Sequence, residues 1–504
     1  MLKLAPFLIL LGAASLCAQE QKPNILFIAI DDLRNYVGYF PDEHPSARTP
    51  NIDRLSAEGV SFTNAYCQSP MCAASRNSLM TGLLPSTTGA YGFQQRREIP
   101  SMEVETLPEH FRNNGYTTIG TGKLHHGSTA EGHGPDPEEW DEYWPSIDKP
   151  RIASSGSYAK RYHPWANVKW GPTVEGDEAQ GDYMHAEWAV KRLEQGLPQP
   201  FFLGVGFYRP HLPWKVPQSY FDDFSPSSGL PPVPKKADDL DDVSEAGVFF
   251  SRYLHKGRYA VEEVIAKNDW YDEALQAYLA CVEFTDKQVG KVLDALAESP
   301  YADNTIVVLW TDHGYNLGEK KAWTKFTLWR EADRVPLIIV VPHKLAGKIC
   351  DAPVQLLDLY PTLVSLAGLP EPAHKLEGRD ISPLLEDVDA PWPYAALTTA
   401  GENNHAVSTS QWRYLRYFNG DEELYKIRED PNEWTNLAGD PVYASVKTEL
   451  ARFLPETNAP NAPGTTLNAY YDRGYWDIDA MTAATLKAVQ STDEEEKEEP
   501  TSSR

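Results

Sequence analysis

Continuous apolar runs alternate with amphipathic stretches along most of the chain. Ile25–Ile30, Phe201–Phe207, Thr305–Trp310 and Val335–Val341 contain few polar positions, as expected for strands that are covered on both faces. Stretches with helical periodicity lie between such runs, and Tyr271–Glu298 is the longest of them. This alternation predicts an α/β fold in which helices sandwich a large, mostly parallel central sheet.

Shorter elements complete the predicted sandwich. Proline at a helix start and glycine after its end are typical boundary signals. We expect helices at Asn51–Glu58, Ala73–Met80, Thr106–Asn114 and Leu356–Ala367, and a strand at Tyr116–Ile119. The segments Lys149–Glu178 and Pro213–Asp242 are predicted to be loop-like.

The pattern changes after about Ser382. Four short strands are predicted at Tyr394–Thr399, His405–Thr409, Trp412–Tyr417 and Glu422–Tyr425, followed by a helix at Val442–Phe453. We therefore expect a main domain over 22–380 and a smaller subdomain of antiparallel sheet plus helix over 381–485. The glutamate-rich end of the chain predicts an acidic disordered tail over 486–504.

The first residues resemble a secretory signal peptide. Lys3 precedes an apolar stretch, Leu4–Leu16, that is too short to span a bilayer. We expect residues 1–18 to be removed and the protein to be secreted or periplasmic in a bacterium. No other segment has the pattern of a membrane span. Cys17 belongs to this first segment, and Cys72 is considered separately below. The other three cysteines, Cys67, Cys281 and Cys350, allow at most one disulfide.

The formal net charge of the 504 residues is −26. A nucleic-acid partner is excluded on this ground, because binding one needs a basic footprint. Hydrophobic residues make up 41% of the chain, enough for a sizeable core. The sequence leaves the oligomeric state open.

Polar residues follow two of the predicted strands directly. Asp31 and Asp32 come after the first strand, and Asp312 and His313 come after Thr305–Trp310. The carboxyl ends of parallel strands gather at one edge of a sheet, where ligands bind. Carboxylate oxygens suit a hard cation such as Ca²⁺, whereas the histidine leaves Mg²⁺ or another divalent ion open. Taken alone, each pair could equally be a helix cap beside a surface acid.

The run Ser69-Pro70-Met71-Cys72-Ala73-Ala74-Ser75-Arg76 resembles the Cys-x-Ala/Pro-x-Arg signature of the type I sulfatases. Supporting segments follow in the family's order. They are the Asp31-Asp32 strand end, Lys123-Leu124-His125-His126, Pro210-His211-Leu212-Pro213, Asp312-His313 and Trp323-Thr324-Lys325. The resemblance covers about Pro23 to Leu454 and is closest to the iduronate-2-sulfatase-like branch.

The resemblance implies that a maturation enzyme oxidises Cys72 to Cα-formylglycine (3-oxoalanine), whose hydrate is the nucleophile. It implies a metal site formed by Asp31, Asp32, Cys72, Asp312 and His313. The implied catalytic residues are Cys72, Arg76, Lys123, His126, His211 and Lys325, of which Lys123, His211 and Lys325 also bind substrate. Many members of the family have the spacing that would select His125 instead of His126, so both stay open here.

Sulfate ester hydrolysis is therefore the predicted activity, with sulfated carbohydrates from polysaccharides as substrates. Two alternatives stay open: a phosphonate or phosphate ester hydrolase of the same alkaline phosphatase superfamily, and an inactive glycan-binding homologue. Aromatic and histidine side chains are candidates for sugar subsites, namely Tyr158, His163, Trp165, Trp170, Trp214 and His405.

Overall fold

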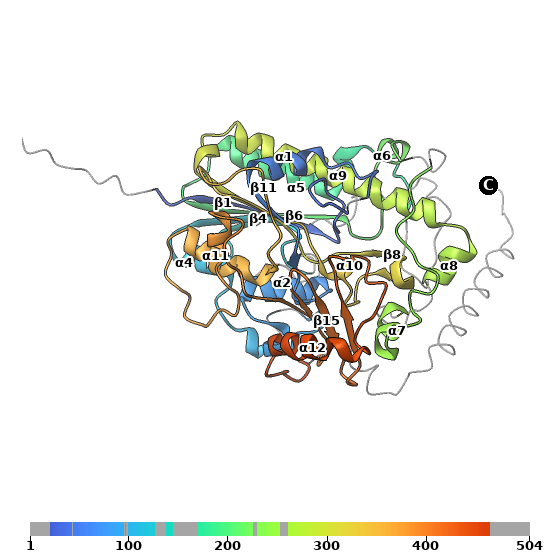
Figure 1. Ribbon diagram of the computed structural model, residues 1–504. Coiled ribbons are helices and arrows are strands. Elements are labelled where there is room, and N and C mark those ends of the chain that lie inside the picture. The colour runs from blue at the N-terminus through green and yellow to red at the C-terminus, as the bar shows by residue number, and fades with distance from the viewer. Residues whose placement is uncertain are drawn as a thin grey trace, which may run out of the picture.

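The computed structural model describes residues 21–42, 44–94, 96, 99–126, 138–144, 170–224, 229–252 and 261–463. A large sheet lies between two layers of helices, and a smaller sheet lies below them in the view of Figure 1. The signal peptide predicted over 1–18 and the tail predicted over 486–504 lie outside the described residues.

The central sheet has eight strands in the order β11-β2-β10-β7-β1-β6-β4-β5. Their bounds are β1 Asn24–Asp31, β2 Val60–Phe62, β4 Thr117–Gly122, β5 Glu142–Trp144, β6 Phe201–Pro210, β7 Thr305–Thr311, β10 Leu337–Val340 and β11 Lys348–Cys350. All pairings are parallel except those of β10, which runs antiparallel to both β7 and β2. The predicted α/β sandwich with a mostly parallel sheet is confirmed.

Strand β1 lies inside the sheet between β7 and β6, and both of its faces are covered. All eight of its residues are buried. Leu26, Ile28 and Ile30 pack into one hydrophobic core, and Ile25, Phe27 and Ala29 pack into the other. Because successive side chains of a strand point to opposite faces, an uninterrupted apolar run serves both cores at once.

Helices cover both faces of the central sheet (Figure 1). Helices α1 (Pro50–Glu58), α5 (Gly181–Gln195) and α9 (Tyr271–Ala297) pack on the face of Leu26 and Ile28. The opposite face carries α2 (Cys72–Thr81), α4 (Leu107–Asn113) and α11 (Leu359–Leu366). The long helix α9 contributes seventeen buried residues, which makes it the main cover of its face.

Short elements connect these layers. They are β3 Ala65–Tyr66, β8 Asn316–Leu317, β9 Trp323–Thr324, β12 Val354–Gln355, α3 Pro85–Thr88, α6 Gln218–Asp222, α7 Glu245–Arg252, α8 Val261–Lys267 and α10 Arg330–Asp333. Helix α6 lies inside the segment that the sequence predicts to be loop-like. The segment predicted over Lys149–Glu178 falls largely outside the described residues.

The smaller sheet is antiparallel, as predicted. Its strands are β13 Ala396–Thr399, β14 His405–Ser408, β15 Arg413–Arg416 and β16 Glu422–Tyr425, and each pairs with the next. Helix α12 (Ala444–Leu450) packs on it through Leu450. The helix predicted over Val442–Phe453 is instead α12 between two 3-10 turns, Pro441–Tyr443 and Ala451–Phe453.

Two further expectations concern the cysteines and the membrane. Cys67, Cys72, Cys281 and Cys350 are all buried and free, so the disulfide that the sequence allows is not formed among them. Every helix in the described part of the chain is too short or too polar to cross a bilayer.

The parallel strands bring the candidate chemistry to one edge. β1 ends at Asp31, β4 ends just before Lys123, β6 just before His211, and β7 just before Asp312. This edge is formed by the carboxyl ends of neighbouring strands, where α/β sheets bind ligands.

Candidate active site

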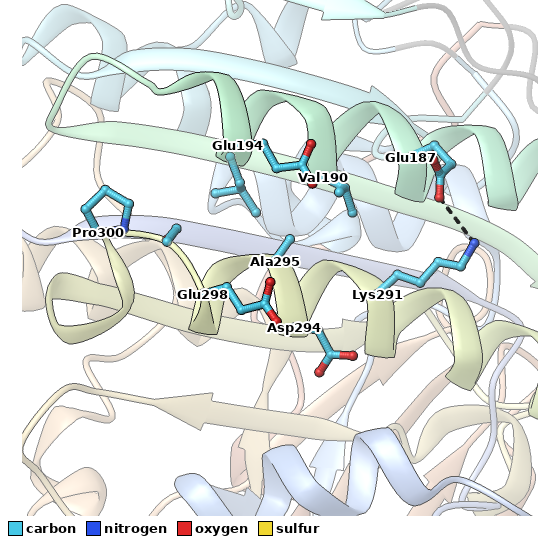
Figure 2. A pocket seen from close by; sticks show the side chains of 10 residues that line it. Glu187, Val190, Glu194, Lys291, Asp294, Ala295, Glu298 and Pro300 are labelled. Carbon is cyan, nitrogen blue, oxygen red and sulfur yellow. Dashed lines mark hydrogen bonds and ion pairs between the residues drawn. The ribbon is translucent and has the colours of Figure 1, made fainter.

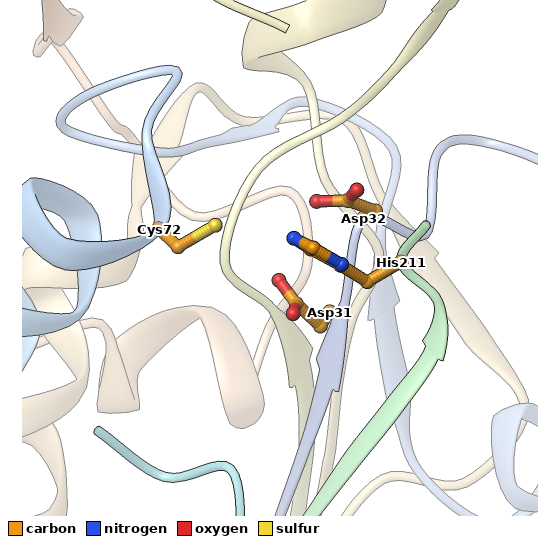
Figure 3. A group of neighbouring side chains, drawn as sticks. All are labelled: Asp31, Asp32, Cys72 and His211. Carbon is orange, nitrogen blue, oxygen red and sulfur yellow. The ribbon is translucent and has the colours of Figure 1, made fainter. Parts of the chain in front are cut away.

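Side chains from four strand ends and one helix start face a common space. Figure 3 shows Asp31, Asp32 and His211 directed toward the sulfur of Cys72. Two groups of side chains could hold a metal ion, and within each group the ligand atoms all lie within 4.8 Å of one another. One group is formed by Asp31, Asp32, Cys72 and His211, and the other by Asp31, Cys72, Asp312 and His313. The two groups share Asp31 and Cys72, so they form one cluster.

The carboxylates are placed by a turn at the end of β1. Asp32 has a φ of 62°, a backbone region in which aspartate is more tolerated than most residues. The turn lets the Asp32 N–H donate to Asp312 Oδ1 at 3.2 Å. Adjacent carboxylates from β1 therefore face the carboxylate that follows β7.

The pKa values of the carboxyls differ according to their cationic neighbours. Burial and Cys72 raise the pKa of Asp31, but Lys123, His211 and Arg76 outweigh them and hold it well below its usual value. For Asp312, burial dominates over the opposing charge of Arg76 and raises the pKa to about 7. Ionised carboxyl groups that lie this close together repel one another, and a cation between them would relieve that repulsion.

His313 is oriented by the backbone of the following residue. Its Nδ1 lies 2.9 Å from the Gly314 carbonyl and therefore donates to it, which turns Nε2 toward the cluster. Nε2 lies 3.2 Å from Cys72 Sγ and 3.4 Å from Asp32 Oδ1. Burial lowers the pKa of His313, but the charge of Asp312 outweighs it and raises the value to about 9.

The donor set fits a divalent metal ion. Asp31 Oδ1 is buried and makes no hydrogen bond within the described part of the chain. Asp31, Asp32 and Asp312 supply oxygen donors, and His313 supplies Nε2 with its other nitrogen fixed by a carbonyl, an arrangement typical of metal-binding histidines. Hard cations such as Ca²⁺ and Mg²⁺ prefer oxygen donors.

Cys72 is the first residue of α2, directly after the N-cap residue Met71. Lys325 Nζ donates to its Sγ at 3.1 Å. Burial would raise the pKa of the Cys72 thiol, but Lys325, Lys123 and His313, together with a hydrogen bond from His126, lower it well below its ordinary value. The helix N-terminus also favours negative charge at this position.

Arg76 lies one turn further along α2 and is buried. Its Nε donates to Asp312 Oδ2 at 2.9 Å, and its Nη2 is 3.7 Å from Asp31 Oδ1. Its Nη1 donates to the Lys123 carbonyl. One guanidinium thus connects α2 with the ends of β1, β4 and β7.

Two lysines bind carboxylates of the cluster. Lys123 Nζ donates to Asp31 Oδ2, and Lys325 Nζ donates to Asp32 Oδ1 at 2.6 Å. Lys123 follows Gly122, whose φ is 76° and where an added Cβ would lie 1.8 Å from the Gly206 carbonyl oxygen. Glycine is therefore required for the turn that directs Lys123 into the cluster.

The neighbouring histidines 125 and 126 have different partners. His125 Nε2 lies 3.0 Å from Glu139 Oε2, whereas His126 hydrogen-bonds with Cys72. Burial lowers the pKa of His126 despite that bond. Of the two candidates that the sequence leaves open, His126 is the one that contacts residue 72.

His211 lies on the loop after β6. Its Nδ1 is 2.6 Å from the Leu212 carbonyl, so this nitrogen donates and Nε2 is left for other partners. Burial lowers the pKa of His211, but Asp32 and Asp31 outweigh it and raise the value. The Arg209 guanidinium donates to the His211 carbonyl at 3.0 Å and holds this loop.

The aromatic subsite candidates are not placed as expected. Trp214 is completely buried and Trp170 is 5% exposed, and their ring centroids are 6.3 Å apart. The prediction that these two residues stack on a sugar ring is wrong, because their faces are covered by protein. His405 is also buried. Tyr158, His163 and Trp165 lie outside the described residues.

Some supporting residues are not among the candidates that the sequence provides. Glu139 holds His125, Tyr278 donates to the Asp32 carbonyl at 2.7 Å, and Ser75 donates to the Asp312 carbonyl at 2.5 Å. Ser75 lies within the Cys72 run, so its position could have been noticed. Tyr278 belongs to α9, far away in sequence, and only the fold brings it to the cluster.

A separate groove lies between α5 and α9 (Figure 2). Its lining includes the carboxylates of Glu187, Glu194, Asp294 and Glu298, and Lys291 pairs with Glu187 at 3.3 Å. An acidic lining repels anions, so this groove does not suit an anionic ester.

Comparison with known proteins gives the chain two family matches. The model described as "Sulfatase" matches residues 23–369. The model described as "N-sulphoglucosamine sulphohydrolase, C-terminal" matches residues 318–459. The first match contains every candidate catalytic and metal-binding residue named above.

Curated relatives and solved structures agree with these matches. A sulfatase of Formosa agariphila is 40% identical over 461 residues, which cover 88% of each chain. The iduronate 2-sulfatase of Mus musculus is 33% identical over 396 residues, covering 69% of each chain. A solved 2-O GAG sulfatase superimposes with a TM-score of 0.67 at 25% identity, over 90% of this chain and 92% of that chain.

Proposed function

The chain belongs to the sulfatase family and is a sulfuric ester hydrolase, and we propose that it releases sulfate from sulfated carbohydrates. We propose Cα-formylglycine, formed from Cys72, as its nucleophile. The observation that carries the proposal is the convergence of carboxylates, lysines and histidines from four strand ends on Cys72.

Asp31, Asp32, Asp312 and His313 would hold the metal ion, together with residue 72. We propose Ca²⁺ because most of the protein ligands are carboxylates. When present, the ion supplies positive charge for the sulfate oxygens, and the hydrated aldehyde supplies a nucleophilic hydroxyl.

The chain's cations bind and orient the ester. Lys325 contacts residue 72 directly and Lys123 binds Asp31 of the same cluster, which supports a role for both in binding the oxygens of a sulfate group there. Arg76 donates to Asp312 and keeps its carboxylate directed into the cluster. These fixed charges favour the negative charge that develops during sulfate transfer.

Two histidines divide the proton transfers. His211, whose pKa is raised, holds a proton at Nε2 that it can donate to the leaving alcohol. His126, whose pKa is lowered, is neutral and can accept a proton from a hydroxyl on residue 72. Environments that push two titratable groups in opposite directions are a common basis for separate acid and base roles.

Sulfated carbohydrates are proposed as the substrate class because relatives are named as sulfatases of such compounds. One relative is an iduronate 2-sulfatase and one structural neighbour is a 2-O GAG sulfatase. A 2-O-sulfated uronic acid unit is therefore the first substrate to test. The proposal includes export from the cell, supported by the apolar stretch Leu4–Leu16. It also includes maturation by a formylglycine-generating enzyme, supported by the run around Cys72.

The proposal is tested with protein co-expressed with a maturation enzyme. Sulfate release is measured from 2-O-, 4-O- and 6-O-sulfated oligosaccharides, beside hydrolysis of matched aryl sulfate and aryl phosphonate esters. We expect release from at least one sulfated sugar and a higher kcat/KM for the sulfate than for the phosphonate.

A faster phosphonate reaction, with no sulfate release from any sugar, would contradict the proposal. It would favour the phosphonate hydrolase alternative. Binding of the sugars without release of sulfate, in protein whose residue 72 is converted, would favour the glycan-binding alternative.

A further inference from the structure

Arg413 reaches from the small sheet into the main domain. It is the first residue of β15 and is completely buried. Its Nε donates to Glu433 Oε1 at 2.8 Å, its Nη1 to Ser408 Oγ at 2.7 Å, and its Nη2 to Asp333 Oδ2 at 2.8 Å and to the Leu328 carbonyl. Every nitrogen of the guanidinium is therefore used in a specific contact.

These contacts hold the segment that follows Lys325. The Leu328 carbonyl and the Asp333 carboxylate both accept from Arg413. Glu433 uses its second oxygen to accept from the Arg330 N–H at 2.8 Å. The segment is thus fixed at residues 328, 330 and 333 by two side chains from the C-terminal part of the chain.

The backbone around Lys325 needs such support. Thr324 and Phe326 have φ values of 73° and 87°. A β-branched or bulky residue seldom adopts this left-handed region, and it persists only where surrounding contacts determine the conformation. If the anchors of the segment are lost, the backbone can relax and move Lys325.

The position of Lys325 matters because its ammonium group lies between two cluster residues. Nζ is 2.6 Å from Asp32 Oδ1 and 3.1 Å from Cys72 Sγ. The next residue, Phe326, donates its N–H to the Pro70 carbonyl at 3.2 Å. The Lys325 segment therefore runs directly against the segment that carries Cys72.

The small sheet also holds the approach to Cys72. Thr398 Oγ1 donates to the Cys67 carbonyl at 2.6 Å, and the Thr399 N–H donates to the Gln68 carbonyl at 2.8 Å. Asp333 joins the two segments, since its carbonyl accepts from the Cys67 N–H at 2.9 Å. Arg413 therefore binds Asp333, the residue that connects the Lys325 segment with the segment before Cys72.

From these contacts we infer that Arg413 is a positioning residue for Lys325 in sulfate transfer. Its planar fork satisfies Asp333, Glu433 and a carbonyl together, which a lysine ammonium cannot do with the same geometry. The small sheet is in this way part of the catalytic apparatus. The inference rests on the proposed role of Lys325 at residue 72.

A double-mutant cycle tests the inference. Arg413→Lys, Lys325→Ala and the double variant are compared for kcat/KM per formylglycine-containing molecule, with the formylglycine content taken from peptide mass. Lys325→Ala is expected to lower kcat/KM about 100-fold. Arg413→Lys alone is expected to lower it about tenfold or more, because small displacements of catalytic groups are costly. In the Lys325→Ala background, the same change should cost less than about twofold, because the effect acts through Lys325.

Arg416→Lys is the matched control, since Arg416 lies at the exposed end of the same strand. It should leave kcat/KM unchanged. If Arg413→Lys does not fold, Glu433→Gln replaces it in the cycle, because glutamine has the shape of the glutamate that accepts from the Arg330 N–H. The loss of kcat/KM that Glu433→Gln causes should likewise be smaller in the Lys325→Ala background.

Equal losses in both backgrounds would overturn the inference and make Arg413 a residue of general stability. A Lys325→Ala variant with unchanged kcat/KM would instead overturn the proposed role of Lys325. The two failures are therefore distinguishable.

Discussion

At the scale of single residues, the cluster depends on charges that are buried together. Asp31, Arg76 and Asp312 have at most 1% exposure, and each contacts an oppositely charged neighbour. Such groups are costly to bury unless they are paired, and clusters of this kind are concentrated at functional sites. Their pairing around Cys72 is the physical basis of the proposed chemistry.

His211 gives a prediction for the pH dependence. Its pKa lies above the ordinary value of 6.5, so the protonated acid is present below that raised pKa and is lost as the pH rises through it. The kcat/KM profile of the matured enzyme should therefore fall on the alkaline side. His211→Asn should remove this step and lower kcat/KM for alkyl sulfates about 100-fold or more. It should have a smaller effect on a nitrophenyl sulfate, whose leaving group needs no proton.

His125→Asn is the control for that profile, because His125 pairs with Glu139 instead of residue 72. An alkaline step that persists unchanged in His211→Asn would assign the acid role elsewhere, with Lys325 as the next candidate.

The carboxylates give a prediction for metal binding. Protein freed of metal by a chelator should gain thermal stability when Ca²⁺ is added, by about 2.7 kcal/mol at 100 times the dissociation constant. Asp32→Asn removes one charged donor and should reduce the shift at equal Ca²⁺. Differential scanning fluorimetry measures both. Asp303→Asn, an exposed acid before β7, should behave as wild type. Equal shifts in Asp32→Asn and wild type would place the ion at another site.

Single residues differ in how well the sequence predicts their place. Cys72, Arg76 and the strand-end acids are predictable because the motif and the strand ends are local features. Arg413, Glu433 and Tyr278 are not, because their partners lie far away in sequence and no periodicity marks them. Trp214 shows the converse, since an aromatic suited to sugar stacking is used in the core.

At the scale of elements, capping interactions connect the layers. Asp286 of α9 is buried and accepts from the Asn51 N–H at 3.1 Å and from the Ile52 N–H at 2.8 Å. These are first-turn groups of α1, which have no partner within their own helix. One carboxyl thus fixes α1 to α9.

Asp286→Ala should lower the free energy of unfolding by about 1–3 kcal/mol, because buried N–H groups lose their acceptor. Burial raises the pKa of Asp286 to about 6, above its ordinary value of 3.8. Its stabilising contribution is therefore complete below the ordinary value and decreases as the pH rises toward 6. The difference from wild type in urea unfolding should be larger at pH 4 than at pH 7.

Asp294→Ala is the comparison on the same helix. Asp294 forms an exposed ion pair with Arg54, and such pairs contribute at most about 1 kcal/mol. If Asp294→Ala costs as much as Asp286→Ala, capping is not the reason for the loss.

Elements are predicted best where the apolar pattern is long. β1, β6, β7 and α9 match the sequence-based ranges within a few residues, because complete burial leaves a continuous signal. Three-residue strands such as β2 and β11 are missed, since three residues carry no periodicity. The antiparallel direction of β10 is also not encoded locally and follows from its connection to β7.

At the scale of the whole molecule, the two sheets are coupled through buried polar contacts. Arg413 of β15 pairs with Asp333 of α10, and β13 bonds to the segment before Cys72. An interface that contains buried, satisfied charges resists separation, because either side alone would leave an unpaired charge.

We therefore predict that the main domain and the C-terminal subdomain unfold in one cooperative transition. Differential scanning calorimetry should give a single peak whose calorimetric and van't Hoff enthalpies agree. Two separate peaks would show that the subdomain unfolds independently. Such behaviour would also weaken the inferred role of Arg413.

The charge of the whole chain contrasts with that of its site. The chain carries a formal −26, yet Arg76, Lys123 and Lys325 converge on residue 72. These cations favour binding of an anionic ester in this local region, whereas the net negative charge of the chain opposes nonspecific binding of anions.

The most direct test of the proposed function combines two measurements on one sample. Protein co-expressed with a maturation enzyme is digested to obtain the mass of the Cys72 peptide, and free sulfate released from 2-O-sulfated uronate oligosaccharides and an aryl sulfate is measured in parallel. We predict conversion of Cys72 to formylglycine, sulfate release in proportion to that conversion, and loss of release in Cys72→Ala. Equal release from Cys72→Ala, or from wild type with an unconverted cysteine, would contradict the central claim that residue 72 is the nucleophile.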